Sequence, residues 1–87
     1  MPTVLRVNGF RFMVYGPPRE HPPPHVHVGF GATGLVVIRL PIGTLPARVW
    51  AVYGMKDGDV ATAFRLAEHH HELLLRAWRS VHGQKAE

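Results

Sequence analysis

The fold is decided by residues 3–15, which read TVLRVNGFRFMVY. Asn8 and Gly9 separate two runs rich in β-branched and aromatic residues. Asn-Gly is the strongest short-range hairpin signal, because both residues of a two-residue turn take a positive φ. The turn fixes the register, which pairs Val7 with Phe10, Arg6 with Arg11, Leu5 with Phe12, and Val4 with Met13. One face is then apolar and is expected to be buried: Thr3, Leu5, Val7, Phe10, Phe12 and Val14.

The rest of the chain extends this hairpin into a layered domain. Residues 25–30 (HVHVGF) and 34–40 (GLVVIRL) are β-rich and predict two more strands, after a proline-rich loop over residues 16–24. Residues 41–56 are broken by Pro and Gly, and their second half fits either a short strand or one or two helical turns. Apolar residues then recur three and four apart, which predicts a helix over 58–82.

We therefore expect one domain over residues 1–87, of the α+β class. The predicted architecture is a two-layer sandwich, with a four-stranded, mostly antiparallel sheet (3–7, 10–15, 25–30 and 34–40) and one long C-terminal helix.

The amino-acid composition favours some classes of function and excludes others. The 87 residues carry a formal charge of +4, and arginine supplies eight of the ten cations. Arginine binds phosphate and carboxylate groups in a bidentate manner, so an anionic partner is expected, with nucleic acid first. The absence of cysteine excludes disulfides, cysteine zinc sites and a thiol nucleophile. No apolar run is long enough for a membrane span and the start does not resemble a signal peptide, so we expect a cytoplasmic protein without a membrane partner or a cofactor.

The alternation of the strands predicts where the charge gathers. If Val26 and Val28 face the helix, then His25 and His27 point to the opposite face of the sheet. Arg6, Arg11 and Arg39 fall on that same face. One interpretation is an anion or nucleic-acid site in which the arginines hold phosphate. The other is that outward charge only keeps the sheet soluble and protects its edges.

His25-Val26-His27 is the second candidate site. Alternate positions on a strand place both imidazoles side by side. That spacing suits a general acid and base, because histidine titrates near neutral pH. It also suits two metal ligands, with Glu20 or His21 as a third from the proline-rich loop. A merely polar surface is the third interpretation.

Three stretches resemble a small bacterial family, domain-of-unknown-function family number 4160. They are the opening MPTVLRVNGFRF, the segment EHPPPHVHV at residues 20–28, and LLLRAW at residues 73–78. The signature positions that carry over are Asn8-Gly9 and residues 23–27. The resemblance implies a protein that pairs with a small protein encoded nearby, in an arrangement similar to toxin–antitoxin pairs.

Three functions follow as hypotheses. The first is a toxin–antitoxin-like module that contacts RNA or another nucleic acid through the Arg/His face. The second is a non-catalytic binding partner of a neighbouring small protein, or a homodimer, using an apolar patch at Trp50 and Tyr53. The third is a metal-binding protein that uses His25, His27 and Glu20.

Overall fold

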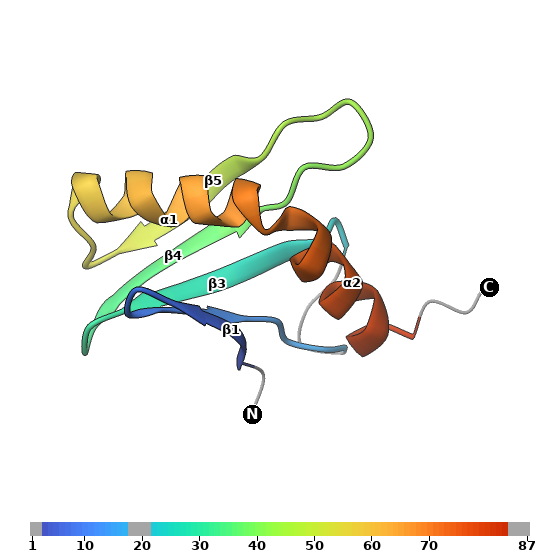
Figure 1. Ribbon diagram of the computed structural model, residues 1–87, viewed down its shortest axis with the longest axis horizontal. Coiled ribbons are helices and arrows are strands. Elements are labelled where there is room, and N and C mark those ends of the chain that lie inside the picture. Colours follow the sequence, from blue (N-terminus) through green and yellow to red (C-terminus); the bar gives the residue numbers. More distant parts are fainter. Residues whose placement is uncertain (1–2, 18–21, 84–87) are drawn as a thin grey trace.

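The protein is a five-stranded antiparallel sheet with two helices packed on one face (Figure 1). The computed structural model describes residues 3–17 and 22–83. Its elements are β1 (Thr3–Val7), β2 (Phe10–Met13), β3 (His25–Phe30), β4 (Gly34–Arg39), β5 (Arg48–Tyr53), α1 (Asp57–His69) and α2 (His71–Val81). The strands lie in sequence order across the sheet. The predicted α+β two-layer class is confirmed, but the predictions of four strands and of one long helix were wrong.

The β1–β2 hairpin forms around the expected turn. Asn8 and Gly9 have φ values of 50° and 85°, as a two-residue hairpin turn requires. The register agrees with the prediction at three pairs: Val7 with Phe10, Arg6 with Arg11, and Leu5 with Phe12. An irregularity between Thr3 and Leu5 then places Thr3, not Val4, opposite Met13, and Val4 packs against the core.

The fifth strand, β5, occupies part of the segment that the sequence left ambiguous. A turn closed by the Ile42–Leu45 bridge returns the chain alongside β4. Val37 pairs with Ala51 and Ile38 with Val49, so Trp50 is an extra residue in a β-bulge. The bulge interrupts the strict alternation of β5, and this is why the alternation was hard to recognise.

The predicted helix over 58–82 is broken at His70, whose φ and ψ are −104° and 20°. Histidine is a poor helix former, and three occur in succession at residues 69–71. The His71 ring also lies 2.8 Å from the Glu68 carbonyl through Nδ1 and so engages a backbone acceptor at the break. The break lets α1 cover β4 and β5 while α2 packs near the start of β3.

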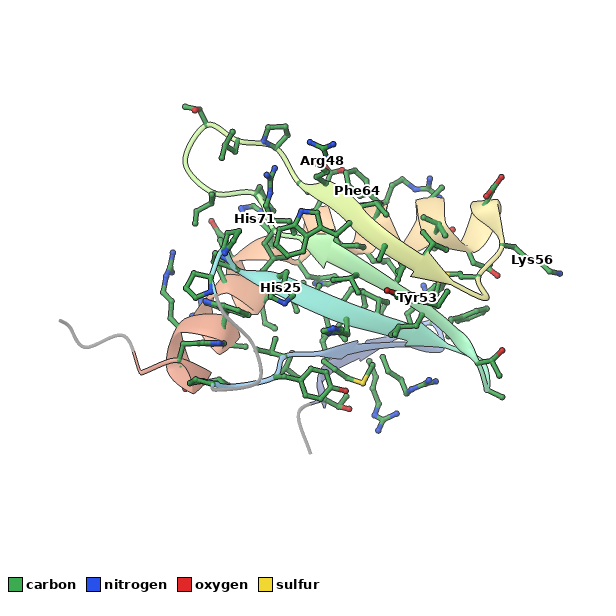
Figure 2. The ribbon with its side chains drawn as sticks, turned by 180° about the vertical axis from the view of Figure 1, so that it is seen from behind. His25, Arg48, Tyr53, Lys56, Phe64 and His71 are labelled. Atoms are coloured by element: carbon green, nitrogen blue, oxygen red, sulfur yellow. The ribbon has the colours of Figure 1, made fainter. Side chains whose placement is uncertain are left out.

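The core lies between the helices and one face of the sheet. Its largest fully buried side chains come from the strands, the segments that follow them, and α2: Phe12, Val14, Val26, Val28, Val36, Ile38, Leu40 and Leu74. Each buried side chain of this size contributes about 1.5–3 kcal/mol. The other face of the sheet carries no helix, as Figure 2 shows from behind. Neither of the described helices is long and apolar enough to cross a membrane.

Candidate nucleic-acid interface

Within the described residues, the carboxylates are confined to the helical layer of the fold, whereas arginines occur in both layers. The five strands contain four arginines, Arg6, Arg11, Arg39 and Arg48, and no Asp or Glu. All four carboxylates of the described residues lie on the helices, at Asp57, Asp59, Glu68 and Glu72. The strands therefore carry positive charge from arginine and no negative charge from carboxylates.

The strand register places all four arginines on the face that the helices leave open. Arg6 pairs with Arg11, and Arg11 pairs with Gly29. At the other end of β3, His25 pairs with Arg39, and Arg39 pairs with Arg48. Because Gly29 and His25 are four residues apart on one strand, they belong to the same face. We call this surface the Arg face, and its outermost rows are the Arg6–Arg11 row and the Arg39–Arg48 row.

Two arginine pairs therefore lie directly across a ladder from one another. Like charges in this position destabilise a sheet, by an amount that can approach about 1 kcal/mol. A ligand that carries negative charge would relieve the repulsion at both rows.

Arg11 is held flat against the sheet by its neighbours. Its Nη2 donates a hydrogen bond to the Gly31 carbonyl at 3.1 Å. The side chain crosses Gly29 closely enough that a Cβ there would lie 2.6 Å from Nη2 and 3.2 Å from Cζ. The absence of a side chain at Gly29 is thus what allows the Arg11 guanidinium to lie over β3.

His25 is placed on the predicted face but is largely covered. It is 7% exposed, and its ring lies between Trp50 on β5 and Trp78 on α2, with centroid distances of 5.0 Å to each. Its Nδ1 lies 2.9 Å from the carbonyl oxygen of Pro23. The signature segment before β3 therefore fixes the orientation of this imidazole.

His27 is half-buried and lies nearer the middle of the Arg face. It pairs with Met13 and Val37, and the Tyr15 ring meets it edge-on at a centroid distance of 5.0 Å. The His25 and His27 rings are 5.7 Å apart. The structure thus brings the two predicted acid–base residues together, with His27 the more accessible of the pair.

Arg39 is anchored to the loop before β5. Its Nη2 donates a hydrogen bond to the Pro46 carbonyl, and its Nε is buried without a hydrogen-bond partner in the described part of the chain. Arg48, directly opposite, is exposed. These contacts place one arginine of this row in a fixed position and leave the other extended into solvent.

Three residues of β5 lie on this face although the sequence did not assign them to it; two of them, Trp50 and Tyr53, were predicted as an apolar patch for a partner protein. They are Arg48, Trp50 and Tyr53, and the two aromatic side chains are 45% and 57% exposed. The run RVWAVY at residues 48–53 is rich in β-branched and aromatic residues, which is the signal that favours a strand there.

The proposed metal site stays a prediction. Glu20 and His21, the alternatives for its third ligand, lie outside the described residues. Within residues 3–17 and 22–83, no group of three or more His, Cys, Asp or Glu side chains is close enough to hold a metal ion.

Comparison with known proteins identifies one family. Its sequence model, described as a domain of unknown function (DUF4160), matches residues 9–79. Searches of curated proteins and of solved structures find no match. The matched region contains β2 through most of α2, including the Pro23–His27 signature and most of the Arg face. Because the match spans well over half of the sequence, the chain belongs to the DUF4160 family.

Proposed function

We propose that the protein binds RNA, or another single-stranded nucleic acid, on the Arg face. The observation that carries the proposal is the pair of opposed arginines at each end of a sheet face without carboxylates. Repulsion between the paired arginines lowers the stability of the free protein. Phosphate groups would remove that cost and accept charge-assisted hydrogen bonds from the guanidinium groups.

The spacing of the two arginine rows favours an extended polyanion over a single small anion. Gly29 and His25, which mark the two rows on β3, are separated by four residues. At about 3.3 Å per residue, the rows are about 13 Å apart. A single phosphate cannot bridge that distance, whereas a nucleic-acid strand carries a phosphate at every nucleotide.

Exposed aromatic side chains beside the arginines support a single-stranded ligand. Trp50 lies next to the Arg39–Arg48 row, and Tyr53 lies at the end of the Arg6–Arg11 row. Unpaired bases stack on exposed aromatic rings of open sheets, and each stacked base is worth about 1–3 kcal/mol. A double helix keeps its bases stacked inside and offers no such contact.

Cleavage of the bound strand is a separate hypothesis that rests on His25 and His27. Acid–base cleavage of RNA without a metal needs one group to take the 2′-hydroxyl proton and another to protonate the leaving oxygen. His27 is the more accessible of the two, so His27→Ala is the informative variant. Cleavage by the wild type in EDTA that is lost in this variant would support the hypothesis, and unchanged cleavage would contradict this mechanism.

Binding is tested by fluorescence anisotropy with a labelled single-stranded RNA of mixed sequence. The variant Arg6→Ala/Arg48→Ala removes one exposed arginine from each row. The matched control, Arg76→Ala/Arg79→Ala, removes the same charge from the exposed side of α2. Contacts worth about 1.5 kcal/mol or more each predict roughly a hundredfold loss for the sheet variant. Equal losses in the two variants would contradict the proposal.

Pairing with a small partner protein, as in toxin–antitoxin systems, remains a prediction from the sequence. It is compatible with binding of RNA on the Arg face, because the helical layer on the opposite side of the sheet stays available to another protein.

A further inference from the structure

Exposed apolar side chains gather at one edge of the molecule. Seven large hydrophobic residues of the described chain are exposed, and five of them lie between Ile42 and Tyr53. Trp50 and Tyr53 belong to the Arg face, which leaves Ile42, Leu45 and Val52 for this edge. This segment contains β5, which is an edge strand of the sheet, and the loop before it, which projects beyond the sheet in Figure 1. Apolar side chains concentrated in this way mark a surface that another molecule covers.

A groove runs along the same edge, between β5 and α1. Its volume is about 490 Å³, and its lining is mostly apolar: Val49 from β5 and Val60, Ala61 and Phe64 from α1. Two charged residues of α1, Asp57 and Arg65, complete the lining. Figure 2 shows Phe64 beside β5 at this edge. The groove is thus an apolar surface with one negative and one positive group.

Two opposite charges on α1 are placed symmetrically about a small residue. Asp57, Ala61 and Arg65 are spaced by four, so they lie on one side of the helix. Ala61 is the midpoint, and the two charges lie about 6 Å along the axis on either side of it, at 1.5 Å per residue. Within the described part of the chain, Arg65 donates a 3.4 Å hydrogen bond to Thr62 Oγ1, and neither charge has an ion pair.

A second copy of the same helix complements this arrangement. If two α1 helices pack antiparallel with a two-fold axis at Ala61, Asp57 of each helix meets Arg65 of the other. The small Ala61 side chains permit close approach at the axis, within the usual 8–10 Å between packed helices. A parallel arrangement would instead oppose like charges.

We propose that this face is the interface of a homodimer, formed by the α1 helices and the groove beside β5. The same patch serves both copies, as a two-fold interface requires. Val60 and Phe64, which pack against the core of their own copy, line the contact, and the exposed Ile42, Leu45 and Val52 border it. The inference is independent of the proposed function, because the Arg face lies on the opposite side of the sheet and stays open.

We expect the two copies to meet through their helices, because β5 is unsuited to pairing with a second β5 in a continuous sheet. The bulge at Trp50 disrupts the regular spacing of backbone groups along this strand. Bulges of this kind protect edge strands against pairing with another sheet. The groove and the charges on α1 are therefore the specific part of the interface.

The test is a charge exchange measured by sedimentation velocity at tens to hundreds of micromolar protein. We expect the wild type to be a dimer. Asp57→Arg alone and Arg65→Asp alone each place like charges at both symmetric contacts and should weaken dimerisation at least tenfold. The double variant Asp57→Arg/Arg65→Asp restores opposite charges and should recover the dimer.

A second variant does not depend on charge. Ala61 is exposed in the single chain, so Ala61→Trp should leave the fold intact while its bulk at the two-fold axis prevents association. Circular dichroism melting of every variant checks that the chain remains folded. A monomeric wild type, single variants that dimerise normally, or a double variant no better than the singles would overturn the proposal. If a different protein covers this face, the wild type should be monomeric on its own, and that result would also overturn the homodimer.

Discussion

Replacing Gly29 with alanine tests whether the position of Arg11 matters for binding, without removing any charge. A Cβ at this position would lie 2.6 Å from Arg11 Nη2 and 3.2 Å from Cζ. The guanidinium is the end of a flexible side chain, so it would move away and break its 3.1 Å hydrogen bond to the Gly31 carbonyl. Gly29→Ala therefore releases Arg11 from the surface of the sheet.

The change in stability should be small, because two effects oppose each other. Loss of a hydrogen bond costs about 0.5–1.5 kcal/mol. Replacement of glycine by alanine in an extended strand lowers the entropy of the unfolded chain and stabilises by about 0.4–1 kcal/mol. The net change in the free energy of unfolding should stay within about 1 kcal/mol.

The change in RNA affinity should be larger and should be distinguishable from loss of the charge. Releasing Arg11 should weaken binding by about three- to tenfold, which corresponds to about 1 kcal/mol. Arg11→Ala removes the charge-assisted contact itself and should cost tenfold or more. It should also lower the slope of log affinity against log salt by about 0.7, whereas Gly29→Ala should keep the slope.

The assay is anisotropy of a labelled single-stranded RNA between about 50 and 200 mM salt, a range over which phosphate contacts change affinity strongly. Urea unfolding is measured in parallel. Gly58→Ala is the control, because a Cβ there meets no atom within 4 Å and the position lies on α1. Wild-type affinity in Gly29→Ala, with weak binding in Arg11→Ala, would refute the importance of orientation. Wild-type affinity in both would remove Arg11 from the interface.

Three further substitutions test the site and the fold. Trp50→Ala should lower RNA affinity by about 1–3 kcal/mol in the anisotropy assay, because a base loses its stacking partner. An unchanged affinity would exclude stacking on this ring. Ile38→Ala should lower the free energy of unfolding in urea by about 2–5 kcal/mol, since its side chain is fully buried; a loss below about 1 kcal/mol would contradict its place in the core. Gly9→Ala should cost about 1–2 kcal/mol in the same measurement, because φ is 85° and the new Cβ would lie 3.2 Å from Phe30. A neutral result would argue against the predicted turn geometry.

The sheet face of the arginines could be predicted because each step rests on strict geometry. A two-residue Asn-Gly turn permits only one register, and alternation along a strand then assigns every side chain to a face. Arg6 and Arg11 were assigned in this way, whereas Arg39 was assigned by assuming that Val26 and Val28 face the helix. The observed register places all three on one face. Local sequence was sufficient here because the determining interactions are themselves local or periodic.

The features that escaped prediction depend on contacts between distant segments. The strand character of residues 48–53 depends on pairing with β4, and its bulge at Trp50 breaks the pattern of alternation. The covering of His25 comes from Trp50 and Trp78, which are 25 and 53 residues away in the sequence. The break at His70 allows α2 to dock near β3, and helical periodicity does not reveal this contact. Tertiary packing thus decided the parts of the site that the local pattern left open.

We propose that the open sheet face, rather than the helices, contacts nucleic acid. Titration of isotope-labelled protein with single-stranded RNA, followed by NMR through the Nε–Hε signals of the arginine side chains, distinguishes the two surfaces. The signals of Arg6, Arg11 and Arg48 should shift, while those of Arg65, Arg76 and Arg79 on the helices should stay in place. Shifts confined to the helix arginines, or no shifts at saturating RNA, would contradict the proposal.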